Sequence, residues 1–289
     1  MSKLDHELVW LNVPEGARLF GRYYPAASDA PFCICLHGLT RNSRDFEDFA
    51  PQLALEGYRV LALDMRGRGE SDYAKDPSRY QLATYLADCL AWLDTFDVER
   101  AIWIGSSMGG GIGMMAGALH PERVAALILN DIGPEVDAKG VANIARIAGK
   151  GKPIQSWKDA AQRCRDVNGH VHPDEMSEAF WLAFARRTHR QEGPQRFRSD
   201  YDPAVLTMLG GGAPAKERWN AFDLLQEIPT LLVRGALSEL LTREIATRMR
   251  ARHAKMKLVE VPRTGHTPLL TEKIAFDAIL SFLAALRFS

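Results

Sequence analysis

Short apolar runs alternate with stretches of helical spacing along most of the chain, and this alternation restricts the fold more than any other feature. The first two segments, 7–13 and 18–24, each alternate apolar and polar residues, which predicts an antiparallel hairpin. Further strands are predicted at 32–36, 58–63, 101–104, 124–129, 230–233 and 256–261, and helices at 45–55, 80–96, 242–253 and 274–286. Strands that alternate with helices build a mostly parallel sheet covered on both faces. We therefore expect an α/β fold with an eight-stranded, mostly parallel sheet and helices on both faces.

The alternation is interrupted after the sixth predicted strand. Between 134 and 219 the chain shows helical fragments and polar loops but no convincing strand, and glycine and proline punctuate it at 149–153 and 210–214. The simplest interpretation is a helical cap inserted over one end of the sheet. We expect residues 1–133 and 220–289 to form the core, and residues 134–219, called the insertion below, to form this cap.

One short stretch in this pattern has a chemical signature. Residues 105–109 read G-x-S-x-G, with an apolar strand before them and a glycine-rich helical segment after them. At such a strand–turn–helix junction Ser107 lies in strained backbone with its hydroxyl exposed, and the flanking glycines permit close packing. The helix that begins there directs backbone N–H groups at negative charge beside the serine. The context favours a nucleophile over a capping serine in an ordinary glycine-rich turn.

Polar residues that follow the apolar runs are predicted to gather at one edge of the sheet, because the carboxyl ends of parallel strands share that edge. His37 and Ser107 follow the third and fifth predicted strands, and His266 follows the last. A carboxylate lies between the serine and the late histidine in the chain, either Asp131 after the sixth strand or Glu239 after the seventh. Serine, acid and histidine are thus expected on one rim.

Four motifs make the chain resemble the α/β-hydrolases that have a cap domain. They are His37-Gly38, the D-x-R-G-x-G-x-S stretch at 64–71, the G-x-S-x-G motif and Gly265-His266. The resemblance implies that Ser107 is the nucleophile and His266 the general base. It also implies that the backbone N–H groups of Leu39 and Met108 form the oxyanion hole.

The sequence leaves two candidates for the acid that would orient the histidine. A serine hydroxyl needs a base within hydrogen-bonding reach, and the base needs an acceptor on its other ring nitrogen. The family usually supplies an aspartate three or four residues after a glycine that follows the seventh strand. Three residues past Gly235 is Ser238, which cannot serve, and four residues past it is Glu239. Position favours Glu239, with Asp131 as the alternative.

A serine nucleophile excludes the dehalogenase and epoxide hydrolase branches, which need a carboxylate to form an alkyl-ester intermediate. We expect a serine hydrolase that cleaves a carboxylic ester or lactone of a small, largely apolar substrate through an acyl-enzyme on Ser107. Hydrolysis of a carbon–carbon bond in a ring-cleavage product and perhydrolysis are alternatives with the same serine and histidine. A ligand-binding receptor on a hydrolase frame is the non-enzymatic alternative, and the intact Ser107–His266 pair argues against it.

Charge and composition indicate neither a nucleic-acid nor a membrane partner, so we expect a small-molecule substrate, and they leave the oligomeric state open. The chain has 289 residues with 36 Lys and Arg against 36 Asp and Glu, so neither a nucleic-acid groove nor binding to an anionic membrane is indicated. No apolar run approaches the roughly 18 residues of a membrane span, and the charged N-terminus has no signal-peptide hydrophobic region, which predicts a cytoplasmic protein. The four cysteines show no metal-site spacing, so we expect neither metal nor cofactor.

Two groups of side chains in the insertion could line a pocket. The apolar group comprises Trp157, Phe180, Trp181, Phe184 and Met208. The basic group comprises Arg186, Arg187, Arg190, Arg196 and Arg198. Helical spacing favours internal packing for the first group, and a solvated face is the ordinary interpretation of the second. The sharper alternative for the arginines is recognition of a substrate carboxylate.

Overall fold

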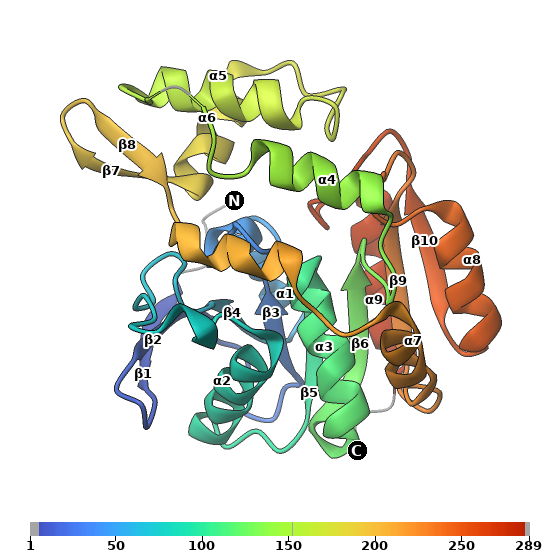
Figure 1. Cartoon of the computed structure of the whole chain (residues 1–289). Helices are drawn as coiled ribbons and strands as arrows, with labels where there is room; N and C mark the ends of the chain where they lie inside the picture. Colours follow the sequence, from blue (N-terminus) through green and yellow to red (C-terminus); the bar gives the residue numbers. More distant parts are fainter. Residues whose placement is uncertain (1–5, 152, 287–289) are drawn as a thin grey trace.

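The computed structural model describes residues 6–151 and 153–286, and its centre is an eight-stranded sheet (Figure 1). In spatial order the strands are β1 (Glu7–Asn12), β2 (Arg18–Tyr24), β4 (Arg59–Asp64), β3 (Phe32–Leu36), β5 (Ala101–Ser106), β6 (Val124–Asn130), β9 (Thr230–Gly235) and β10 (Lys257–Val261). The β1–β2 and β2–β4 pairs are antiparallel, and every other neighbouring pair in this sheet is parallel. The predicted α/β fold with an eight-stranded, mostly parallel sheet is confirmed.

The strand order reverses beside β3, which pairs with β4 on one side and with β5 on the other. Open α/β sheets bind ligands outside the carboxyl ends of the strands at such a point of reversal. His37 directly follows β3 and Ser107 directly follows β5. The topology therefore places both residues at the position where a ligand site is expected.

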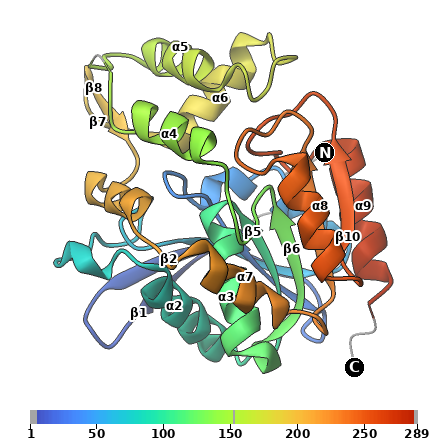
Figure 2. The ribbon, with the colours of Figure 1, turned by 45° about the vertical axis from the view of Figure 1, so that its right-hand side comes forward.

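Helices cover both faces of the sheet (Figures 1 and 2). The helices on one face are α2 (Leu82–Thr95), α3 (Met108–Leu119), α7 (Ala215–Asp223) and α8 (Arg243–Arg252), and those on the other are α1 (Ala50–Leu55) and α9 (Lys273–Ala284). Successive side chains of a strand point to opposite faces, so Ile34 and Leu36 pack into the first layer while Cys33 and Cys35 pack into the second. Within the described part of the chain, no helix has the length and apolar character to cross a membrane.

One predicted helix is broken in the structure. A continuous helix over 45–55 is wrong: a 3-10 turn covers Ser43–Phe46, and α1 begins only at Ala50. Pro51 lies in the first turn of α1, and proline has no N–H to donate to a preceding turn. The amphipathic pattern was right about burial, because Phe46 and Leu53 both pack against the sheet.

The insertion lies over the carboxyl ends of the central strands (Figures 1 and 2). Its elements are α4 (Ala138–Ile147), α5 (Trp157–Asn168), α6 (Glu178–Thr188), β7 (His189–Gly193), β8 (Arg196–Ser199) and a 3-10 helix (Pro203–Gly210). The expectation that it contains no strand is wrong, since β7 and β8 form an antiparallel hairpin. This hairpin buries little, chiefly His189 and Phe197, and Glu192 pairs with the two arginines of β8, so its sequence lacks an apolar run. The division into core and cap stays a prediction.

Candidate active site

Ser107 occupies a strained turn between β5 and α3. Its backbone has φ 51° and ψ −115°, a conformation that L-residues rarely adopt. Two glycines make the turn possible: a Cβ on Gly105 would overlap the backbone of Gly109 and Gly110, and a Cβ on Gly109 would overlap the carbonyl of Leu36. The G-x-S-x-G spacing therefore supplies the space that a serine in this turn needs.

The tightness of this turn gives a stability prediction. We expect Gly109→Ala to lower the free energy of unfolding by about 3 kcal/mol, because the added methyl group overlaps rigid backbone. Gly111→Ala is the matched control on the same helix, where a Cβ meets only Leu82 at 3.9 Å. The control should stay within about 1 kcal/mol of the wild type, on the stabilising side. Urea unfolding of both variants measures the difference, and equal midpoints would contradict a steric requirement at Gly109.

Ser107, His266 and Asp131 form a continuous hydrogen-bonded series. Ser107 Oγ lies 3.0 Å from His266 Nε2, and His266 Nδ1 lies 2.8 Å from Asp131 Oδ2. Asp131 is fully buried, whereas the side chain of His266 is 17% exposed. A serine, a histidine and a carboxylate joined in this order can pass the serine proton to the histidine while the carboxylate fixes the ring.

Asp131 is held by the strand and loop beside it. It directly follows β6 with φ 56°, and its Oδ1 accepts a hydrogen bond from the backbone N–H of Gly235 at 2.9 Å. Its Oδ2 also accepts from the hydroxyl of Ser238 at 2.5 Å, and that hydroxyl oxygen in turn accepts from the N–H of Leu241 at 3.0 Å. Each carboxylate oxygen therefore has a fixed donor besides the histidine, so the carboxylate cannot rotate freely.

The preference for Glu239 over Asp131 is corrected by the structure. Glu239 is exposed, and its Oε2 accepts from Asn143 Nδ2 at 2.8 Å, whereas the Nδ1 of His266 has Asp131 as its partner. The cause is a turn after β9, in which the N–H of Ser238 donates to the carbonyl of Gly235 at 2.9 Å. This turn directs Ser238 inward and Glu239 to the surface. The signal available in the sequence was the place of Asp131, immediately after the strand next to β5.

The peptide between Gly38 and Leu39 has a fixed orientation. Its carbonyl oxygen accepts from His37 Nδ1 at 2.7 Å and from the N–H of Arg41 at 3.1 Å. His37 Nε2 accepts from the N–H of Met65 at 3.0 Å, so the ring proton is on Nδ1. A trans peptide points its N–H opposite to its carbonyl, and the N–H of Leu39 is therefore directed away from His37. Gly38 itself lies beside Ser107 and lines the cavity described below.

The peptide between Ser107 and Met108 is oriented in the same way. The Ser107 carbonyl accepts from the N–H groups of Gly110 and Gly111 at 3.0 and 3.1 Å. Met108 is the first residue of α3, where an N–H has no acceptor within the helix. Its N–H points opposite to the Ser107 carbonyl. Both N–H groups expected in the oxyanion hole thus belong to peptides whose carbonyls are tied down.

The charged loop at 64–71 has a structural role. Asp64 accepts from the N–H groups of Ser43 and Glu70 at 2.6 and 2.8 Å. Arg66 makes a bidentate pair with Asp88, both distances being 2.6 Å. Arg68 is fully buried and donates to the carbonyl of Leu39 at 2.9 Å. These charge-assisted hydrogen bonds hold the loop against the segment that carries Leu39.

Three of the four buried histidines in the described part of the chain give a pH prediction, and burial lowers the pKa of the fourth, His253, as well. Burial, the largest cause in each case, lowers the pKa of His37 to about 3 and those of His172 and His189 to about 4. In the unfolded chain a histidine titrates near about 6.5, so between that pH and about 4 the unfolded chain binds more protons than the folded protein. The contribution of these histidines to the free energy of unfolding is therefore undiminished above about pH 6.5. Below that pH the free energy of unfolding falls, by at most about 1.4 kcal/mol per pH unit for each histidine.

This dependence can be measured by urea unfolding between pH 7.5 and 5. We expect His172→Gln to flatten the loss of unfolding free energy relative to the wild type, because one of the buried histidines is then missing. His120→Gln is the control, since His120 lies partly exposed at the end of α3 with 41% of its side chain accessible. A His172→Gln profile that falls as steeply as the wild-type profile would contradict the argument.

A cavity of about 500 Å³ lies above Ser107, between the sheet edge and the insertion. It is lined by Gly38, Leu39, Ser107 and His266 from the core and by residues of α4, α5, α6 and the hairpin from the insertion. Of the five apolar side chains considered in the insertion, only Phe184 is part of this lining. Trp157, Phe180 and Trp181 pack together with Phe184 in a small apolar cluster of the insertion. Among the described residues, no group of His, Cys, Asp and Glu side chains could hold a metal ion.

The fold and this site define the class of protein. A family model described as the alpha/beta hydrolase fold matches residues 32–273, and the chain belongs to this family of hydrolases. It is 32% identical over 247 residues to a 3-hydroxybutyrate-oligomer hydrolase of Cupriavidus necator, a match that covers 83% of each chain. A crystal structure of an α/β hydrolase from Novosphingobium aromaticivorans is 38% identical, with a TM-score of 0.89 and coverage of 98% of this chain and 99% of that one. Epoxide hydrolase A of Mycobacterium tuberculosis is 37% identical over 98 residues, or 34% of this chain and 30% of that protein.

Proposed function

We propose that the protein hydrolyses a carboxylic ester or lactone through an acyl-enzyme on Ser107. The observation that carries the proposal is the series Ser107 Oγ–His266 Nε2 at 3.0 Å and His266 Nδ1–Asp131 Oδ2 at 2.8 Å. The similarity to the 3-hydroxybutyrate-oligomer hydrolase supports it, because the units of such an oligomer are joined by ester bonds. Asp131 takes the role of the acid in this proposal.

Acylation begins when His266 Nε2 removes the hydroxyl proton of Ser107. The serine oxygen forms a bond to the carbonyl carbon of the substrate, and the negative charge on the carbonyl oxygen is stabilised by the N–H groups of Leu39 and Met108. Each such donor contributes about 10²- to 10³-fold in rate. The tetrahedral intermediate then collapses, the bond to the leaving oxygen breaks, and His266 gives its proton to that oxygen.

Deacylation repeats the same steps with water. His266 Nε2 removes a proton from a water molecule, the hydroxide oxygen bonds to the acyl carbon, and the oxyanion again lies between the two backbone N–H groups. Cleavage of the bond to Ser107 Oγ releases the acid and returns the proton to the serine. Asp131 stabilises the imidazolium in both halves and stays unprotonated itself.

Epoxide hydrolysis does not suit this site. That reaction forms an alkyl ester on an enzyme carboxylate, and position 107 carries a serine hydroxyl. Carbon–carbon bond hydrolysis and perhydrolysis use a serine and a histidine in the same arrangement, so they become outcomes of the experiment. A receptor without turnover is a further outcome.

The test combines active-site labelling with turnover. A fluorophosphonate should modify the wild type, and peptide mass mapping should place the label on Ser107. The wild type should also release p-nitrophenol from p-nitrophenyl acetate and butyrate. Failure with both esters contradicts the proposal: cleavage of a 2-hydroxy-6-oxo-dienoate would then assign carbon–carbon hydrolysis, peracid formation from acetate and peroxide would assign perhydrolysis, and ligand binding without turnover of any of them would assign a receptor.

A further inference from the structure

We propose that Arg163 binds a carboxylate of the substrate, which makes the protein a hydrolase of small anionic esters. The inference rests on the proposed function, because it assigns the substrate class of the same site. It replaces the largely apolar substrate expected from the sequence by a charged one.

The cavity above Ser107 carries an excess of positive charge. Among the described residues that line it, the cations are Arg41, Lys150, Arg163, Arg187 and Arg198. Asp45 is the single carboxylate in that lining. Such a charge distribution in a concave site attracts anionic ligands and disfavours cationic ones.

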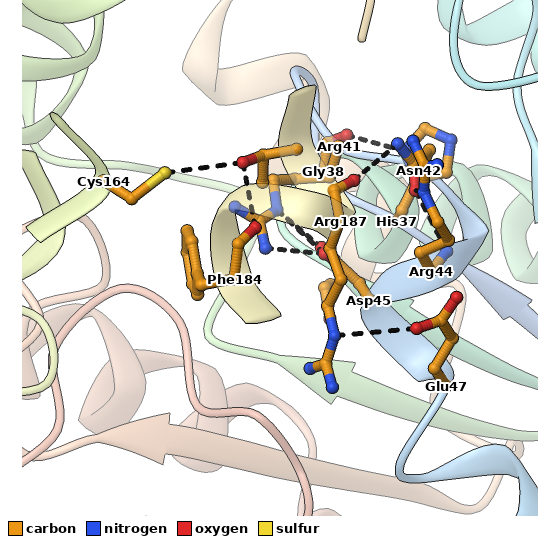
Figure 3. Close-up of polar contacts among 12 residues, drawn as sticks. His37, Gly38, Arg41, Asn42, Arg44, Asp45, Glu47, Cys164, Phe184 and Arg187 are labelled. Carbon is orange, nitrogen blue, oxygen red and sulfur yellow. Dashed lines mark hydrogen bonds and ion pairs between the residues drawn. The ribbon is translucent and has the colours of Figure 1, made fainter. Parts of the chain in front are cut away.

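Three of the four arginines already have carboxylate partners. The ion pairs are Arg41–Asp45, Arg187–Glu47, Arg187–Asp48 and Arg198–Glu192. Figure 3 shows the first of these pairs, in which Arg41 is bidentate to Asp45 and lies 4.3 Å from the ring centre of Phe184. These arginines therefore each have a carboxylate partner within the protein, although the Nε of Arg187 is buried without a hydrogen-bond partner.

Arg163 differs because it has no hydrogen-bond or ion-pair partner within 6–151 and 153–286. It is half-buried on α5, and the residues of that helix that face the cavity follow helical spacing: Arg163, Cys164, Val167 and Asn168. A guanidinium that is partly removed from water, with its donors unused, is stabilised by an anion that accepts two parallel N–H bonds. A carboxylate has the geometry for this.

The guanidinium of Arg163 lies directly against the backbone of Gly151. Gly151 has φ +133°, a conformation that favours glycine, and a Cβ there would overlap the guanidinium. The absence of a side chain at Gly151 thus allows Arg163 to pack directly on the loop that follows α4.

The neighbours of Arg163 do not neutralise it. Burial, together with the positive charges of Arg163 and Arg41, lowers the pKa of His189 to about 4, so this ring is uncharged near neutral pH. Burial raises the pKa of the Cys164 thiol, which is therefore protonated. Among the described residues of this wall, Arg163 is therefore a half-buried cation without a carboxylate partner, beside the neutral His189 and Cys164 and near the exposed Lys150.

Ser107 and Arg163 line the same cavity, one from the sheet edge and one from the insertion. A substrate with its ester carbonyl at Ser107 and a carboxylate at Arg163 would span it. Short esters of hydroxy acids have this form, because each chain ends in a free carboxylate. The relative that acts on 3-hydroxybutyrate oligomers fits the same substrate class.

The experiment compares two substrates that differ in charge alone: the linear dimer of 3-hydroxybutyrate and its terminal carboxamide. We expect the wild type to prefer the acid in kcat/KM. Arg163→Met should lower the acid-to-amide ratio by about 10- to 100-fold, mainly through KM, and should leave the amide within about threefold. Arg165→Met is the matched control on the same helix, since Arg165 does not line the cavity, and it should leave the ratio unchanged.

A binding measurement separates this inference from the proposed function. Calorimetric titration of the Ser107→Ala variant with the two dimers needs no turnover. We expect this variant to bind the dimer acid more tightly than the dimer amide. The double variant Ser107→Ala, Arg163→Met should bind the two dimers equally. Equal binding of acid and amide, or an equal loss on both substrates in Arg163→Met, overturns the carboxylate site. Acid-selective binding in a protein that cleaves neither dimer and no p-nitrophenyl ester would uphold the carboxylate site and overturn the ester hydrolase proposal.

Discussion

Replacing Ser107 by alanine is expected to lower kcat for p-nitrophenyl butyrate by about 10⁴- to 10⁶-fold, with the fold and stability retained. The loss is large because the serine oxygen forms the covalent bond, and no other group reaches the carbonyl carbon in the proposed mechanism. A residual rate above the uncatalysed reaction should remain, since the N–H groups of Leu39 and Met108 can still stabilise the oxyanion. Steady-state assays of both proteins with the same ester measure the ratio of the two kcat values.

Ser106→Ala is the control for this substitution. Ser106 is the last residue of β5, and its hydroxyl accepts a hydrogen bond from Asn130 Nδ2 at 2.8 Å instead of contacting His266. The control should keep kcat within about tenfold of the wild type, because only a supporting hydrogen bond is lost. A Ser107→Ala variant that retains full activity, or a Ser106→Ala variant that loses it, would contradict the assignment of the nucleophile.

Asp131→Asn is expected to lower kcat by about 10⁴-fold. The amide keeps the shape of the side chain but can present an N–H to His266 Nδ1, which favours the ring tautomer whose Nε2 carries the proton and cannot accept one from Ser107. The imidazolium that forms during the reaction also loses its negative partner. The effect should fall on kcat and not on KM, because the carboxylate does not touch the substrate.

Glu239→Gln distinguishes the two candidate acids. Its carboxylate is exposed and hydrogen-bonded to Asn143, so the substitution should leave kcat within about twofold of the wild type. Large losses in Glu239→Gln with little effect in Asp131→Asn would return the acid to the loop after β9. Circular dichroism and urea unfolding of both variants exclude a loss caused by misfolding.

The parts of the fold that the sequence predicted well are those with a strong local signal. Buried parallel strands such as β3 and β5 are short continuous apolar runs, and all eight strands of the sheet could be located from these runs and the leading hairpin. The turn at Ser107 was predictable because its glycines stand at fixed spacing around the serine, although one of them, Gly109, is required by a contact with Leu36 of β3. The structure also brings the predicted serine and histidine together.

The predictions that failed depend on contacts that are distant in sequence or on single residues. Pro51 breaks a stretch whose apolar pattern alone indicates one helix. The β7–β8 hairpin has too few buried side chains for its period to be visible. The choice between Asp131 and Glu239 depends on the turn after β9, which directs Ser238 inward and Glu239 to the surface. The spacing of the two acids in the sequence does not predict that orientation.

The contact between Asp131 and Ser238 limits how such a site can change over time. Introducing an aspartate at 238 alone would place two carboxylates against each other, because the two side chains are 2.5 Å apart. Removing Asp131 alone leaves the histidine without an acid. A transfer of the acid from the end of β6 to the loop after β9 therefore passes through an impaired intermediate in either order, and two coordinated substitutions separate these versions of the same enzyme architecture.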